Sequence, residues 1–420
     1  MFTKQIHQLL NVMDKLDLLK DIQRAPNFPD EPYTYGFTLR LQNIATFSDG
    51  DFKNLTASAL SFFSAEIGLL KCLMEGLERF SLVTYKNTQI KRSSFTNLKK
   101  YALDPMQFVN KASTKDLEFG WLHGIDFIED RSCLLPAQTL HINYLQNHKD
   151  EAFLTSPVST GAAAGFTHES TLLRALYEVI ERDAFMCVYL NKNKPPQIDI
   201  SRINNNNVQT IIRKAKRYRL ELFVFDITNN LNIPTFLAVL IDKTGIGPAV
   251  SVGLKTNLST ENALVDSMEE AFLSRSYIRV QMYKRRINTY KSSAIQTIEQ
   301  RGLYWAHPKM VANLAFLLNQ KTMLEIELTS LQRNEKEELH IVHSRLKEKN
   351  IEVYYADITA PQLKEKGVIV YKGVMPQLQP LYLHEDKREW KIDRLKTVYE
   401  YFEHKDFSLE SINDTPHPLL

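Results

Sequence analysis

The sequence is poor in the residues that mark several protein classes. Among 420 residues there are 3 cysteines, Cys72, Cys133 and Cys187, too few and too scattered for a disulfide framework or a cysteine-based zinc site. Glycine (14) and proline (16) are also scarce, which favours long regular elements over open linkers. No apolar run approaches the roughly 18 residues that a membrane-spanning helix needs. Basic and acidic side chains nearly balance, 52 against 49, which argues against a general nucleic-acid or membrane-surface binder.

What is present is typical of a globular protein that can bury a site. Hydrophobic residues make up 44% of the chain and charged residues 24%, so disordered and fibrous classes are excluded. The N-terminal stretch MFTKQIHQLLNVMDKLDLLK breaks its apolar run with charges, as an amphipathic helix does and a signal peptide does not. We therefore expect a cytoplasmic protein that binds neither membrane nor nucleic acid.

Strand and helix patterns are interleaved along the chain. Periodicity predicts helices over residues 1–30, 57–82, 167–190, 260–280 and 388–403, and helical patterns fill residues 305–349. Runs rich in β-branched and aromatic residues predict strands in RLELFVFDIT, IPTFLAVLID, IEVYYADIT and GVIVYKGV. This order predicts an α+β (mixed α/β) fold. We expect a helical N-terminal extension over 1–50 and one continuous domain over 51–420.

Two predicted helices carry the same pattern of charges. Lys71, Glu75, Glu78 and Arg79 in the first helix have the spacing of Arg174, Glu178, Glu181 and Arg182 in the second. Positions i, i+4 and i+7 share one helix face, so each helix has a single charged stripe on an otherwise apolar surface. Buried carboxylates that converge repel one another unless a cation holds them, and Mg²⁺ with bound phosphates is the natural candidate. An ordinary salt-bridge ladder on the surface is the competing interpretation of each copy.

A loop of small residues precedes the second helix. The segment Ser159-Thr160-Gly161-Ala162-Ala163-Ala164-Gly165 lets backbone approach a ligand closely, and a helix with Thr167 as a candidate N-cap follows it. Such a loop can bind phosphate or simply allow tight packing. The sequence contains no GxxxxGK[ST] motif and no GxGxxG after a strand, so P-loop and dinucleotide-binding sites have no support.

The segment STGAAAGFTHESTLLRALYEVIERDAF resembles the central signature of the YcaO family. LLKCLMEGLERF resembles the first Glu-x-x-Glu-Arg helix of that family, and GLKTNLSTENALVDSMEEAFLSR resembles its third motif helix. The resemblance runs from about residue 55 to the C-terminus. It implies mixed sheets with helices that converge on a carboxylate-rich nucleotide pocket.

By this resemblance the protein is an ATP- and Mg²⁺-dependent cyclodehydratase. Such an enzyme phosphorylates a backbone amide of a ribosomally made peptide, and a thiazoline or oxazoline ring results, as in the biosynthesis of bacteriocin-like products. The nucleotide-binding residues implied are Cys72, Glu75, Glu78, Arg79, Ser159, Gly161, Gly165, Thr167, Glu178, Glu181, Arg182 and Glu270. The metal ligands implied are Glu75, Glu78, Glu169, Glu178, Glu181 and Glu270. The Pro-containing tail implies catalytic assistance by His417, Pro418 and Leu420, through proton transfer by His417 or the terminal carboxylate.

Departures from the family pattern leave two alternatives open. Phe166 follows Gly165 where a polar residue is common, Ser170 stands at a usual acid, and Asp266 and Leu273 replace a basic residue and a glutamine. A docking or scaffold subunit with a weakened ATP site is the first alternative. A nucleotide- or metal-dependent enzyme unrelated to peptide rings is the second.

The resemblance also implies partners. The expected substrate is a precursor peptide. The first fifty residues look too short for a leader-binding clamp, so we expect a partner protein to bind the leader peptide. A flavin-dependent dehydrogenase that oxidises the rings is a further expected partner, and a homodimer is compatible with the pattern.

Overall fold

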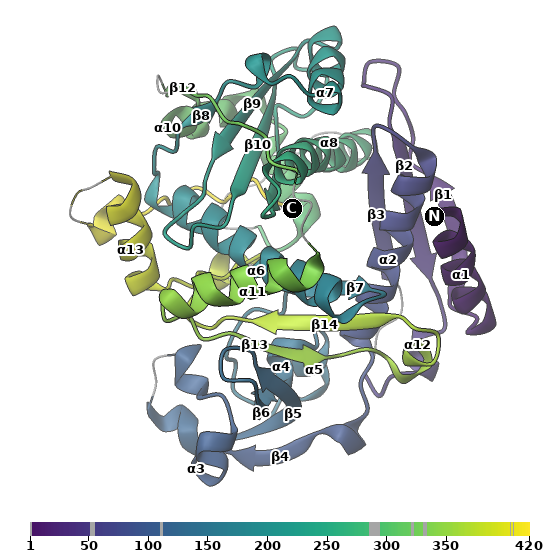
Figure 1. Cartoon of the computed structure of the whole chain (residues 1–420), viewed down its shortest axis with the longest axis vertical. Helices are drawn as coiled ribbons and strands as arrows, with labels where there is room; N and C mark the ends of the chain where they lie inside the picture. The colour runs from purple at the N-terminus through teal and green to yellow at the C-terminus, as the bar shows by residue number, and fades with distance from the viewer. Residues whose placement is uncertain are drawn as a thin grey trace. The chain divides into compact units, whose positions relative to one another are not determined.

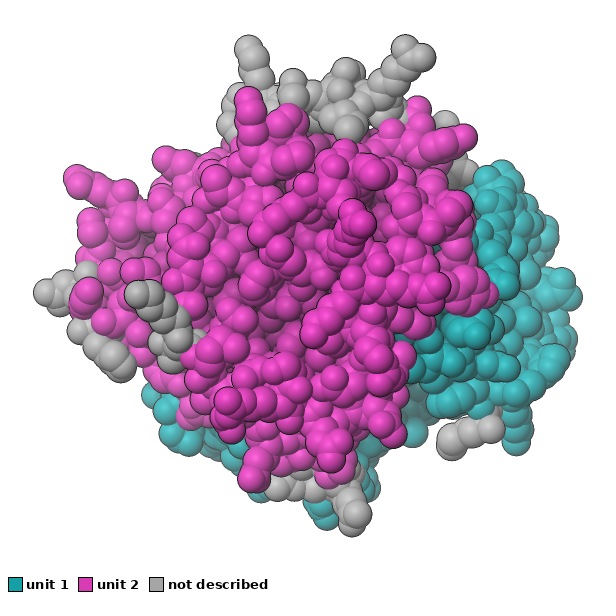
Figure 2. Space-filling view, turned by 90° about the horizontal axis from the view of Figure 1, so that it is seen from above, with its two compact units in different colours: residues 1–25, 35–179, 334–377 teal, residues 26–34, 180–333, 378–420 magenta. Residues whose placement is uncertain are grey.

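Two compact units make up the protein. The computed structural model describes residues 2–50, 55–109, 112–284, 295–320, 323–330, 334–403, 405 and 407–420. Unit 1 comprises residues 1–25, 35–179 and 334–377, and unit 2 comprises 26–34, 180–333 and 378–420; Figure 2 colours them separately. Each unit has its own cluster of buried apolar side chains. Among the described residues, no helix is both long enough and apolar enough to cross a membrane.

A three-stranded antiparallel sheet begins unit 1. Its order is β1 (Leu19–Arg24), β2 (Tyr35–Leu41) and β3 (Leu55–Ser61). The helices α1 (Phe2–Lys15) and α2 (Ala65–Val83) pack against this sheet (Figure 1). The apolar side of α2 packs into the core of unit 1, so its charged stripe lies on a different side of the helix.

The second sheet of unit 1 has six antiparallel strands. They are ordered β4–β5–β13–β14–β7, and β6 pairs with β5. Their bounds are β4 (Lys91–Ser94), β5 (Glu118–Asp126), β6 (Arg131–Pro136), β7 (Ala162–Gly165), β13 (Tyr354–Asp357) and β14 (Ile369–Val374). The remaining helices of this unit are α3 (Phe95–Leu98), α4 (Ala137–Leu140), α5 (Tyr144–Asn147), α11 (Glu335–Glu348) and α12 (Pro361–Lys364).

The helix α6 (His168–Asn191) contributes to both units, because its residues up to Val179 belong to unit 1 and those from Ile180 onward belong to unit 2. Unit 2 is built on a five-stranded sheet of order β11–β10–β9–β8–β12, in which only the β8–β12 pair is parallel. The strands are β8 (Gln197–Ile198), β9 (Leu220–Asp226), β10 (Thr235–Asp242), β11 (Val250–Thr256) and β12 (Met323–Leu324). The helices are α7 (Asn206–Arg217), α8 (Thr260–Lys284), α9 (Ile298–Trp305), α10 (Ala315–Leu318) and α13 (Ile392–Glu403).

The close packing of α8 on β11 depends on Gly253. A Cβ atom at this position would lie 2.1 Å from the backbone nitrogen of Ala271 and 2.3 Å from the carbonyl oxygen of Ser267. The helix therefore lies directly on the strand at this point. This contact brings Glu270 of α8 within reach of the backbone of β11.

The predicted α+β class is confirmed. The helices expected over 167–190, 260–280 and 388–403 are α6, α8 and α13, and the expected strands are present as β9, β10, β13 and β14.

Three helix predictions are wrong in part. The helix expected over 1–30 ends at Lys15, and the helix expected over 57–82 begins only at Ala65, where Ser64 accepts a capping hydrogen bond from the Ile67 N–H at 3.2 Å. Part of each remaining segment forms a strand, β1 or β3, because sheet pairing with β2 prevails over local helical periodicity. Segment 305–349 contains short helices, the strand β12 and α11, while residues 321–322 and 331–333 lie outside the described ranges. The expected division at residue 50 stays a prediction, although residues 1–50 contain β1 and β2 and are not purely helical.

Candidate functional site

The charged stripe of α2 lies beside the outer edge of β3. An oxygen of Glu75 and a guanidinium nitrogen of Arg79 are 2.6 Å apart. Arg79 also donates a hydrogen bond to the carbonyl oxygen of Thr56, and Glu75 accepts one from the backbone N–H of Ser58. The ion pair is therefore held in place by main-chain groups of the neighbouring strand.

Three carboxylates of unit 1 interact electrostatically. Burial raises the pKa of Glu78 well above its ordinary value, and the negative charges of Glu178 and Glu75 raise it further. Burial likewise raises the pKa of Glu75, which Arg79 opposes. We call Glu75, Glu78 and Glu178 the carboxylate cluster of unit 1. In the absence of a bound cation, the charged form of this cluster is unfavourable.

The small-residue loop reaches this cluster. The backbone N–H of Gly161 donates a hydrogen bond to Glu178 at 2.9 Å. Gly161 has φ of 87°, and a Cβ atom here would lie 2.4 Å from the carbonyl oxygen of Gly373, so glycine is required for both reasons. The Gly373 N–H in turn donates to the Gly161 carbonyl oxygen at 2.7 Å. The loop predicted to bind phosphate is thus fixed between Glu178 and β14.

Lys372 is a residue of this site that the sequence analysis missed. It lies in β14, is only 3% exposed, and donates hydrogen bonds to the carbonyl oxygens of Val158 and Thr160 at 2.8 and 2.5 Å. Burial lowers its pKa to about 8, while Glu178 and Glu78 favour its charged form. A lysine in the middle of the apolar run IVYKGV was the available signal. Lys372 both braces the loop and supplies positive charge to the carboxylate cluster.

A second group of charges lies in unit 2. Glu181 accepts a hydrogen bond from the Thr256 N–H at 2.7 Å and pairs with Arg182 at 2.7 Å. Glu270 accepts one from the Leu254 N–H at 2.9 Å. Burial and the neighbouring Glu181 raise the pKa of Glu270 to about 7, which Arg182 and Lys255 oppose. We call Glu181 and Glu270 the carboxylate pair of unit 2.

The first turn of α6 holds the remaining predicted residues. The Thr167 hydroxyl accepts a hydrogen bond from the Ser170 N–H at 3.3 Å, which confirms it as a cap, and donates one to Glu335 at 2.8 Å. Gly165 ends β7, where it pairs with Ile369. Glu169 lies 3.8 Å from Lys336. Since Glu169 precedes Glu178 by nine residues, the two are about 13 Å apart along the helix axis, and the structure does not bring them together.

The thiol of Cys72 is directed into the core of unit 1. Its sulfur lies 3.5 Å from the carbonyl oxygen of Ala57 and 3.6 Å from that of Phe37, and the residue is fully buried. Burial, with the negative charge of Glu75, raises its pKa to about 12. These contacts give Cys72 a packing role, and its contact with a nucleotide stays a prediction.

The C-terminal tail is built into the core of unit 2. The Pro416 carbonyl oxygen accepts hydrogen bonds from the Tyr189 hydroxyl at 3.1 Å and the Trp305 indole at 2.9 Å. His417 is fully buried, and its Nε2 lies 2.8 Å from the carbonyl oxygen of Tyr382. Burial holds the pKa of His417 well below its ordinary value, so the ring is neutral. The role of His417, Pro418 and Leu420 in proton transfer stays a prediction.

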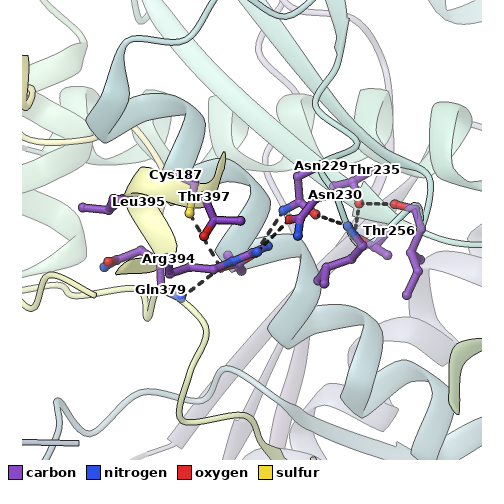
Figure 3. Close-up of polar contacts among 12 residues, drawn as sticks. Cys187, Asn229, Asn230, Thr235, Thr256, Gln379, Arg394, Leu395 and Thr397 are labelled. Carbon is purple, nitrogen blue, oxygen red and sulfur yellow. Dashed lines mark hydrogen bonds and ion pairs between the residues drawn. The ribbon is translucent and has the colours of Figure 1, made fainter. Parts of the chain in front are cut away.

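A buried ion pair anchors α6 inside unit 2, and part of its network is drawn in Figure 3. Asp183 accepts hydrogen bonds from two guanidinium nitrogens of Arg394, the shortest at 2.6 Å. The Gln379 N–H and the Asn229 side-chain amide donate to the same carboxylate at 2.9 and 3.0 Å. Asp183 directly follows Glu181 and Arg182, so this network fixes the segment of α6 that carries them.

Within the described ranges, no three His, Cys, Asp or Glu side chains form a ready-made metal-binding group. The predicted metal ligands are distributed instead between the cluster of unit 1, the pair of unit 2 and the first turn of α6.

Comparison with known proteins places this chain in a family. The family model described as "YcaO cyclodehydratase, ATP- and Mg²⁺-binding" matches residues 63–379. An uncharacterised protein of Methanothermobacter thermautotrophicus is 25% identical over 282 residues, which cover 66% of this chain and 70% of that protein.

Solved structures share the fold. A heterocyclase in complex with substrate and cofactor has a TM-score of 0.75 at 18% identity, and the match covers 98% of this chain but 57% of the heterocyclase chain. YcaO from Methanopyrus kandleri bound with AMPPCP and Mg²⁺ has a TM-score of 0.67 at 14% identity, covering 93% of this chain and 94% of that one. The Escherichia coli microcin synthetase McbBCD complex gives 0.61 at 15% identity, covering 90% and 96%. The family match spans well over half of the chain, and the protein belongs to the YcaO cyclodehydratase family.

Proposed function

We propose that this protein is an ATP- and Mg²⁺-dependent cyclodehydratase that forms thiazoline or oxazoline rings in a ribosomally made peptide. Membership of the YcaO family supports this function, as do structural neighbours that are a heterocyclase and a microcin synthetase. The observation that carries the proposal is the carboxylate cluster of unit 1, in which burial and then the charges of Glu178 and Glu75 raise the pKa of Glu78 well above its ordinary value. A divalent cation removes that repulsion.

The residues present fit Mg²⁺ with a nucleotide. All the acidic side chains offer oxygen ligands, and Mg²⁺ commonly binds through one or two carboxylates together with phosphate oxygens and water. Glu75, Glu78 and Glu178 in unit 1, and Glu181 and Glu270 in unit 2, are the proposed ligands. Bound Mg-ATP would supply the phosphoryl group that activates the amide oxygen of the peptide.

The basic side chains have separate tasks in this proposal. Arg182, next to Glu181, and Arg79, next to Glu75, would contact phosphate oxygens. Lys372 would hold the Ser159–Gly161 loop in position through the carbonyl oxygens that it contacts. The loop then presents the backbone of an anion-binding segment to the nucleotide.

A precursor peptide and a leader-binding partner are proposed as well. McbBCD is a complex, and one of its structures contains bound pro-MccB17. By analogy, we propose that this protein also works on a precursor peptide in a complex with other subunits, and that a flavin-dependent dehydrogenase is a further partner.

The direct test is loss of water from a Cys/Ser-rich precursor peptide, measured by mass spectrometry, together with ATP hydrolysis. We expect both to require Mg²⁺, and Glu178→Gln to lower turnover by at least about 100-fold, as loss of a ligand or its support does. Glu348→Gln, at an exposed position of α11, is the control and keeps full turnover. A protein that binds partner subunits but never binds Mg-ATP would be a scaffold subunit instead.

A separate prediction concerns the tail. Deleting residues 415–420 removes the acceptors of Tyr189, Trp305 and Arg301, so we expect a lower melting temperature as well as lost turnover. His417→Gln separates the two effects, because glutamine can donate to the Tyr382 carbonyl oxygen but cannot transfer a proton as imidazole does. If His417 assists proton transfer, turnover falls while the melting temperature is kept. Unchanged turnover in this variant contradicts the catalytic role.

A further inference from the structure

The outer edge of β3 offers main-chain hydrogen-bonding groups. Among the described residues β3 pairs with β2 on one side only (Figure 1). On the other side, the Thr56 carbonyl oxygen accepts a hydrogen bond from Arg79, and the Ser58 N–H donates one to Glu75. Thr56 and Ser58 are two residues apart, so their main-chain groups point the same way, away from β2.

Glu75 and Arg79 occupy the positions of a missing strand. A neighbouring strand would present an N–H to the Thr56 carbonyl oxygen and a C=O to the Ser58 N–H. The guanidinium of Arg79 and the carboxylate of Glu75 provide these two groups, and the two side chains are themselves paired at 2.6 Å. Side chains thus provide the hydrogen-bond partners of this edge. One N–H and one C=O of a peptide backbone can replace the guanidinium and the carboxylate.

The composition of β3 suits the approach of another chain. Its sequence, LTASALS, has small side chains at most positions. Ala57 and Ala59 are buried toward the core, while Thr56 is exposed and Ser58 is half-buried. The small side chains of β3 would therefore leave room for the side chains of an added strand beside them on the faces of the sheet.

We propose that the outer edge of β3 binds the substrate peptide in extended form, as an added strand held by hydrogen bonds to Thr56 and Ser58. The identity of the occupant rests on the proposed function, because an enzyme that modifies backbone amides must hold a backbone. Recognition through main-chain groups demands no particular side chain of the peptide. Glu75 also belongs to the carboxylate cluster, so the added strand would lie beside the proposed nucleotide ligands of unit 1.

The first arm of the test changes the protein. Ser58→Pro removes the N–H that points away from β2, at an edge position where proline is tolerated. Ser58→Ala keeps that N–H and removes only the hydroxyl, which lies 3.1 Å from the Thr38 hydroxyl. With a fluorescent ten-residue Gly/Ser/Cys peptide as the probe, we expect about tenfold weaker binding for Ser58→Pro, measured by anisotropy, and unchanged binding for Ser58→Ala.

The second arm changes the probe and uses the unaltered protein, so that it does not depend on the folding of a variant. The same peptide with alternate backbone nitrogens methylated cannot pair as a strand, and we expect it to bind about tenfold more weakly. Equal affinity of both probes, equal affinity of Ser58→Pro and the unaltered protein, or absence of binding overturns the proposal.

Nucleotide binding separates this proposal from the function on which it rests. If Mg-ATP is hydrolysed while Ser58→Pro binds the probe normally, the docking site is wrong and the function stands. If Mg-ATP is never bound while proline and N-methylation both weaken probe binding, the docking site stands and the function is wrong.

Discussion

Replacing Asp183 by alanine is expected to lower the free energy of unfolding by about 3–5 kcal/mol, the usual cost of removing one partner of a buried ion pair. Asp183 is fully buried, and Arg394 is 6% exposed. Without the carboxylate, the guanidinium of Arg394, the Gln379 N–H and the Asn229 amide lose their shared acceptor (Figure 3). Urea denaturation followed by circular dichroism measures the change.

The matched control is a pair that faces solvent. Lys243 and Glu221 are 2.9 Å apart, and their side chains are 68% and 45% exposed. Lys243→Ala should therefore cost less than about 1 kcal/mol. If Asp183→Ala costs no more than this control, the buried network does not anchor α6. A loss of turnover without a loss of stability would instead indicate that Asp183 acts directly at the site.

Long periodic segments were predictable because their local signals agree with their packing. Extended apolar patterns occur in α6, α8, β9 and β10. In each of these elements the local pattern and the packing in the core favour the same secondary structure. β3 shows where this fails. Its small residues fit a helix as well as a strand. Pairing with β2, which lies earlier in the chain, makes this segment a strand.

The residues of the candidate site also differ in how far the sequence can identify them. The spacing of the charges is the same in α2 and α6, and this repeat singled out their glutamates as candidates. Lys372 could not be assigned, because its acceptors are 214 and 212 residues away along the chain and are backbone carbonyl oxygens with no sequence signature. The pairing of Asp183 with Arg394 spans 211 residues and is equally invisible to spacing. Sequence identifies charged groups on one element, whereas partners from distant elements need the fold.

Glu270→Gln is expected to stabilise the ligand-free protein at high pH and to abolish its proposed activity. The pKa of Glu270 is raised from 4.5 to about 7, so the folded state keeps this proton over a pH range in which the unfolded chain has released it. Stability from this group is therefore complete below about pH 4.5 and is lost as the pH rises through 7. At about 1.4 kcal/mol per unit, the loss approaches ~3 kcal/mol, an upper value because Glu181 shares the titration.

Glutamine has no proton to lose, and its side-chain oxygen can still accept the Leu254 N–H. The stability of the variant should therefore exceed that of the unaltered protein by a margin that grows between pH 5 and pH 8, as urea denaturation at each pH would show. Mg-ATP should raise the melting temperature of the unaltered protein, because a ligand that binds only the folded state stabilises that state. The rise should be much smaller for the variant. Turnover should fall by at least about 100-fold.

Glu410→Gln, at an exposed position of unit 2, is the control for removal of a charge. It should change neither the pH dependence of stability nor the response to Mg-ATP. If Glu270→Gln responds to Mg-ATP as fully as this control does, Glu270 is not a ligand of the nucleotide complex. If the stability margin does not grow with pH, the carboxylate pair of unit 2 carries no electrostatic strain. If Glu270→Gln gains stability and also loses Mg-ATP binding, both results follow from one cause: Glu270 destabilises the ligand-free protein and binds the cation of the nucleotide complex.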